Sequence, residues 1–118
     1  KVKTHAGDVD FEVQPELLSL FSNRDFGRYA GEKGEMNVCF ISNNDITGGN
    51  SGSAMFNARG ELLGLAFDGN WEAMSSDILY EPKMQRCIGV DVRYILFMIE
   101  KYGKAGDLIR ELKIVSGK

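Results

Sequence analysis

Hydrophobic residues gather in short segments along this chain, and at 9–13 they alternate with polar residues at period two, which is typical of β-strands. A tight turn at 57–60, in which Gly60 suits a positive φ, joins two of these segments into a hairpin. The polar residues at 68–70 end the strand that follows this turn. We expect antiparallel strands at 9–13, 36–42, 53–57, 61–67, 77–80 and 86–91.

The spacing of the hydrophobic residues is helical in two other parts of the chain. Proline in the first turn, followed by leucines, predicts a helix over 15–23. One helix face over 92–102 carries Val92, Ile95, Leu96, Ile99 and Tyr102. Asp91 precedes this run as an N-cap, and Gly103 ends it. A shorter helix is expected over 105–112.

The whole chain, residues 1–118, has the length of a single domain, in which a β unit at about 36–91 is closed by C-terminal helices at about 92–113. A composition of 43% hydrophobic and 26% charged residues allows a modest core. The net charge of -3 disfavours nucleic acid as a partner, because binding a phosphate backbone needs a basic surface. No apolar run is long enough to cross a bilayer.

Two cysteines, Cys39 and Cys87, lie in apolar segments that resemble strands. They lack a metal-binding spacing such as C-x-x-C, so we expect no metal site. We expect two buried free thiols, although the sequence leaves a disulfide between them open. Trp71 follows a strand and is expected to pack in the core or at its rim.

The segment 47–54, T-G-G-N-S-G-S-A, holds a hydroxyl nucleophile, Ser51, between glycines. Glycine allows a loop to turn tightly and to point its N–H groups inward. Acyl transfer by a serine peptidase needs an exposed Oγ and N–H donors aimed at the oxyanion, here those of Ser51 and Gly49. The alternative is a structural turn of Gly, Ser and Asn between two strands.

The order strand, G-N-S-G loop, strand, tight hairpin, strand resembles the nucleophile region in the second β-barrel of chymotrypsin-like proteases. The loop would form the oxyanion hole there, and the returning strand would pair with substrate backbone. That strand would end beside the pocket for the P1 side chain, here at residues 66–69.

Longer motifs give a closer resemblance. G-G-N-S-G-S, then N-A-R-G-E-L-L-G-L-A-F-D-G-N-W-E-A-M-S, E-P-K-M-Q-R and V-D-V-R-Y-I-L-F are similar to the bacterial dipeptidyl-peptidases 7 and 11. The resemblance runs from about Phe11 to Val115. These are chymotrypsin-like serine exopeptidases with a large helical insertion, and they remove dipeptides from free peptide N-termini without a metal or organic cofactor.

The resemblance implies roles for four residues. Ser51 is the nucleophile, and Gly49 supplies an oxyanion N–H together with it. Asp68 matches the aspartate that helps to bind the substrate's α-ammonium group, with which a carboxylate forms a charge-assisted hydrogen bond. Gly69 occupies the position that is Arg in members that cleave after acidic P1 residues, which implies a hydrophobic P1 here. Ala54 departs from the family, which usually has Pro there.

The resemblance also implies a longer parent. The chain has no initiator Met or signal-peptide pattern, and we expect it to be a piece that lacks the first barrel, the helical insertion, and the triad His and Asp. Alone it should be inactive, and His5 is expected to be a solvated surface residue. The family implies a periplasmic or cell-surface location, peptide substrates with a free N-terminus, and the rest of the parent as a partner. A homodimeric parent stays open.

Other interpretations remain open at this point. A Do/Deg-type or glutamyl-type endopeptidase would share the G-N-S-G loop, although the helices after 92 differ from the usual Do/Deg continuation. A peptide-binding module on the same fold would leave Ser51 inert. Asp45 could instead bind a Lys or Arg side chain at P1, and Asp68 could be a solvated carboxylate in a turn.

Overall fold

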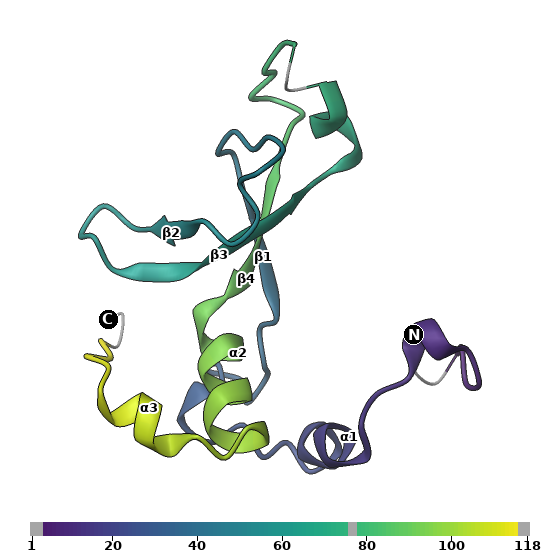
Figure 1. Ribbon diagram of the computed structural model, residues 1–118, viewed down its shortest axis with the longest axis vertical. Coiled ribbons are helices and arrows are strands. Elements are labelled where there is room, and N and C mark those ends of the chain that lie inside the picture. Colours follow the sequence, from purple (N-terminus) through teal and green to yellow (C-terminus); the bar gives the residue numbers. More distant parts are fainter. Residues whose placement is uncertain (1–3, 76–77, 116–118) are drawn as a thin grey trace.

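A four-stranded antiparallel sheet and a layer of helices make up the computed structural model, which describes residues 4–75 and 78–115. The strands lie in the order β1-β4-β3-β2. Figure 1 shows the sheet rising from the helices, with the two chain ends on opposite sides. The expected antiparallel sheet with C-terminal helices is confirmed. The strands are β1 (Cys39–Ser42), β2 (Ala54–Phe56), β3 (Leu62–Gly69) and β4 (Cys87–Asp91).

The helices follow the predicted spacing closely. Asp91 begins α2 as expected, because its carboxylate accepts a hydrogen bond from the N–H of Arg93 at 2.8 Å and is also bound by the Arg93 guanidinium. A π-helical turn carries the helix on to Gly103. The helical elements are α1 (Pro15–Ser22), α2 (Val92–Phe97), the π-turn η4 (Met98–Tyr102) and α3 (Gly106–Arg110).

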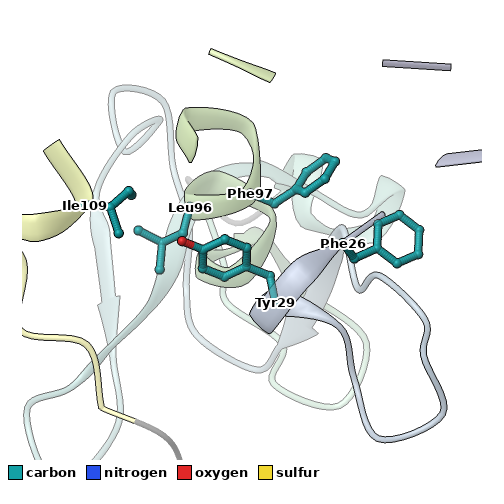
Figure 2. Packing of buried hydrophobic residues seen from close by; sticks show 5 residues of the cluster. All are labelled: Phe26, Tyr29, Leu96, Phe97 and Ile109. Atoms are coloured by element: carbon teal, nitrogen blue, oxygen red, sulfur yellow. The ribbon is translucent and has the colours of Figure 1, made fainter. Parts of the chain in front are cut away.

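The first hydrophobic cluster joins the helices to one another. Phe97 of α2 is fully buried and meets Phe21 and Phe26 edge to face, with ring centroids 5.7 and 5.8 Å apart. Such edge-to-face pairs add to the free energy gained by burial. Figure 2 shows how the buried members gather around α2; they are Phe26, Tyr29, Leu96, Phe97 and Ile109.

The second cluster covers one face of the sheet, where the Phe40 ring packs beside buried Ile46, Met55, Ala66 and Cys87. Glycine is needed beneath this ring. A Cβ on Gly89 would lie 2.6 Å from the Met55 sulfur and 2.8 Å from the Phe40 ring. On this face the large side chains of Phe40 and Met55 therefore pack directly against the backbone at Gly89.

The opposite sheet face, which we call the outer face, is apolar and uncovered. Register places Val90 between Cys39 and Leu65, and places Ile41 beside Ile88. Ile41 is 67% exposed, and Cys39 is exposed beside it. A sheet with two apolar faces needs a partner on each, and the described residues cover only one.

The chain is less compact than an independent domain of its size. Its accessible surface is 8790 Å², whereas about 6,400 Å² is expected for a monomeric protein of 13.1 kDa. Its radius of gyration is 16.3 Å, against about 13.5 Å for a compact domain of this length. Both values indicate surface that a larger structure would cover.

Three strand predictions were wrong in whole or in part. Residues 9–13 contain a 3-10 turn, η1 (Val9–Phe11), because the Asp8 carboxylate caps it through the N–H of Asp10 at 3.1 Å. Of 77–80, Asp77 lies outside the described residues and 78–80 form no strand, since β1 and β3 already occupy both edges of β4.

The third error concerns the end of β3. This strand does not stop at 67 but continues through a bulge, after which Asp68 pairs with Ile88 and Gly69 with Cys87. Cross-strand pairing with β4 therefore overrides the low strand propensity of Asp68 and Gly69.

Burial was also wrongly predicted at two positions. Cys39 is exposed, because strand alternation places it on the outer face, whereas Cys87 is buried on the filled face. Both thiols are free, and burial raises the pKa of the Cys87 thiol. Trp71 is 81% exposed and does not pack in the core.

Candidate active site

The loop that carries Ser51 connects the two edge strands of the sheet, β1 and β2. Asn50 closes it, because its Oδ1 accepts hydrogen bonds from the Thr47 N–H at 2.9 Å and the Thr47 hydroxyl at 3.3 Å. Gly49 and Gly52 have φ values of +92° and +88°, a conformation that strongly favours glycine. The glycines around Ser51 are thus required by the backbone of the loop.

Backbone hydrogen bonds fasten this loop to β3. The Gly52 N–H donates to the Ala66 carbonyl at 2.7 Å, and the Ala66 N–H donates to the Ser53 carbonyl at 2.9 Å. Ser51, which directly precedes these anchors, is exposed, and its Oγ donates to the carbonyl oxygen of Phe67 at 3.3 Å. The hydroxyl therefore lies over the end of β3.

The loop leaves several amide groups available to bind an oxyanion. The N–H groups of Asn50, Gly52 and Ser53 all bond to carbonyl oxygens within this part of the molecule. Among the described residues, the N–H groups of Gly48, Gly49 and Ser51 have no acceptor. All three residues are exposed, so the donors expected at Gly49 and Ser51 are available to a ligand.

A pocket of about 270 Å³ opens beside Ser51. This volume lies just below the range of typical small-molecule sites, which suits one or a few side chains of a substrate. No cationic side chain lines it among the described residues. The lining residues are Ile46, Thr47, Gly48, Ser51, Phe67, Asp68, Gly69, Asn70, Ala73 and Met74.

Asp68 and Gly69 lie in this lining, and Asp45 does not. The Asp68 carboxylate is exposed and accepts a hydrogen bond from the Gly69 N–H at 2.8 Å. One of its oxygens is therefore held at the pocket wall while the other remains available to a cation.

The described residues place no histidine at Ser51. His5, the only histidine of the chain, stacks on Phe11 at 4.5 Å in the N-terminal segment, which Figure 1 shows extending away from the sheet. As expected, it is a surface residue. No three His, Cys, Asp or Glu side chains gather as metal ligands in 4–75 and 78–115.

Sequence reasoning missed three contributors to this site. Asn50 was not singled out, although T-x-x-N is a spacing at which an Asn side chain closes a local turn. Ala73 and Met74 enter the pocket lining from the short helix η3 (Trp71–Ser75), and no pattern in the sequence indicated that this segment folds back over β3.

The Peptidase S46 family model matches residues 1–114 of this chain. The chain belongs to the peptidase S46 family. Curated relatives include dipeptidyl-peptidase 7 of Porphyromonas endodontalis, 61% identical over 108 residues that make up 92% of this chain and 13% of the relative. The Asp/Glu-specific dipeptidyl-peptidase of Capnocytophaga gingivalis is 50% identical over 109 residues, 92% of this chain and 15% of the relative.

Solved structures of this S46 family have the same fold. The crystal structure of DPP11 from Porphyromonas endodontalis in complex with the dipeptide Arg-Glu superposes on this chain with a TM-score of 0.88 at 44% identity. The match covers 93% of this chain and 16% of that protein. The S46 chain described here thus spans only 13 to 16% of the length of these relatives. Its described residues include no helix long and apolar enough to span a membrane.

Proposed function

We propose that the parent of this chain is a serine-type dipeptidyl-peptidase that releases dipeptides from free peptide N-termini, with a hydrophobic residue preferred at P1. One observation carries the proposal: the Ser51 hydroxyl lies beside a pocket of about 270 Å³, next to the N–H groups of Gly49 and Ser51, which have no acceptor among the described residues. The names of the relatives support the same reaction.

In this mechanism Ser51 Oγ attacks the carbonyl carbon of the second substrate residue, and a base from the rest of the parent takes the hydroxyl proton. The N–H groups of Gly49 and Ser51 stabilise the oxyanion. The peptide C–N bond then breaks, and the base returns the proton to the leaving amine. Water hydrolyses the acyl-enzyme and releases the dipeptide.

Asp68 makes the enzyme an exopeptidase in this proposal. Its available carboxylate oxygen binds the α-ammonium group of the substrate, which fixes cleavage at two residues from the N-terminus. The pocket beside Gly69 takes the P1 side chain. Because no cation lines that pocket among the described residues, a glutamyl-type specificity is disfavoured.

The rest of the parent completes the fold. We propose that residues 1–118 are the C-terminal part of a catalytic domain with two chymotrypsin-like barrels, and that the remainder supplies the triad His and Asp. The excess accessible surface and the uncovered outer face support such a packing. The family resemblance extends this proposal to a periplasmic or cell-surface location.

The decisive experiment assays the full-length parent and its Ser51→Ala variant on dipeptide-amide reporters with Leu, Phe, Asp or Lys at P1, each unblocked and N-acetylated. Cleavage of unblocked Leu and Phe reporters only, abolished by Ser51→Ala, is the expected result. Equal cleavage of blocked reporters would indicate an endopeptidase. If a folded parent cleaves none of them, a peptide-binding module is the better explanation.

A further inference from the structure

Gly69 of β3 and Ala73 of η3 lie against each other in the pocket lining, and we call this pair the pocket floor. A Cβ added to Gly69 would lie 2.8 Å from the Cβ of Ala73 and 3.4 Å from Cγ2 of Ile46. Separations below 3.0 Å are not found between real Cβ atoms. Ala73 thus occupies the space that a side chain at 69 would need.

In this chain the close contact, and not the backbone, disfavours a side chain at 69. Gly69 is absent from the residues with positive φ, so its conformation is one that other residues adopt. The Ala73 Cβ is attached directly to the backbone and cannot rotate away. Ala73 is only 8% exposed, so movement would have to come from the whole of η3.

Asn70 fixes η3 in this position. Its side-chain amide donates to the Met84 carbonyl at 2.8 Å and to the Glu72 carboxylate at 2.7 Å, and its Oδ1 accepts from the Arg86 N–H at 2.8 Å. The Ala73 N–H in turn donates to the Asn70 carbonyl at 2.9 Å. The floor is therefore a rigid part of the pocket.

We propose that Ala73, held against Gly69 by the Asn70 hydrogen bonds, sets the depth of the P1 pocket and so limits the size of the P1 side chain that the enzyme accepts. This inference rests on the proposed function, in which that pocket binds P1. Ala73 acts by occupying space, since it lines the pocket and its side chain bears no reacting group.

The test uses the full-length parent and unblocked reporters with Ala, Leu or Phe at P1. Ala73→Leu should lower kcat/KM for the Leu and Phe reporters by about tenfold or more, because even one extra methylene group in a pocket changes kcat/KM by that factor. The Ala reporter should change by less than about threefold. Ala58→Leu, at an exposed position in the β2–β3 turn, is the matched control and should alter none of the three.

A second pair of variants tests the contact itself and covers the case in which Ala73→Leu does not fold. Gly69→Ala should lower cleavage of all three reporters, and adding Ala73→Gly should restore them to within about threefold of the parent. An equal loss on every reporter with Ala73→Leu, or no restoration by Ala73→Gly, would overturn the inference. Neither result concerns the proposed function, which fails only if the unmodified parent cleaves no unblocked reporter.

Discussion

The Ser51 hydroxyl donates a hydrogen bond to the carbonyl oxygen of Phe67 at 3.3 Å. A hydroxyl in this arrangement is a neutral donor, and it becomes a nucleophile only when a base accepts its proton. The contact joins the loop of Ser51 to the strand end that carries Asp68 and Gly69. This hydrogen bond therefore helps to fix the position of Ser51 relative to Asp68 and Gly69.

Asn50 should matter for turnover although it does not contact substrate in the proposed mechanism. Asn50→Ala removes the acceptor of two Thr47 hydrogen bonds and frees the loop that holds the proposed oxyanion donors. We expect kcat/KM of the parent to fall on the order of 100-fold, because a small displacement of catalytic groups reduces the rate by about this factor. Steady-state kinetics on the unblocked Leu reporter measure this.

Asn44→Ala is the matched control, because the Asn44 side chain makes no hydrogen bond in the described part of the chain. Equal rates for the two variants would show that Asn50 does not organise the loop.

Asp68→Asn tests recognition of the substrate N-terminus. The amide oxygen preserves the bond from the Gly69 N–H, so the fold should be kept while the negative charge is lost. The kcat/KM for unblocked reporters should fall roughly 10- to 150-fold, the value of a charge-assisted hydrogen bond. N-acetylated reporters should stay uncleaved by both proteins. An unchanged kcat/KM on the unblocked reporters would argue against binding of the α-ammonium group by Asp68.

Local sequence patterns predicted the part of the fold that depends on local chemistry. The hairpin turn at Gly60 and the N-cap at Asp91 were predicted correctly, since each follows from one residue and its neighbours. The strand expected at 9–13 was wrong because Asp8 caps a turn there, a local competitor that alternation does not reveal.

Features that depend on distant partners were not predictable in the same way. The extension of β3 through Asp68 and Gly69 requires β4, and the pocket floor requires η3 to fold back until Ala73 meets Gly69. The exposure of Cys39 depends on which sheet face is filled, and side-chain alternation alone leaves both faces equivalent.

Phe97→Ala should destabilise the helical part of the molecule strongly. Phe97 has no exposed surface and contacts three aromatic rings, those of Phe21, Phe26 and Tyr94. Removing a buried aromatic side chain costs about 3 to 5 kcal/mol. The midpoint of urea inactivation, followed with the Leu reporter, should therefore fall clearly.

The matched control for Phe97→Ala is Leu18→Ala in α1, which removes an exposed side chain and should cost less than about 1 kcal/mol. Similar midpoints for the two variants would mean that this cluster does not stabilise the parent.

The outer face should govern how the isolated 118-residue chain behaves in solution. Large exposed apolar patches promote association, and here Cys39 and Ile41 border a row of apolar side chains with no cover among the described residues. We expect the chain to self-associate, and Ile41→Lys to shift it towards monomer in light scattering after size-exclusion chromatography. Val9→Lys, at an exposed apolar position outside this face, should leave association unchanged. If both substitutions act equally, general hydrophobicity and not the outer face drives association, and the packing proposed for the parent loses its support.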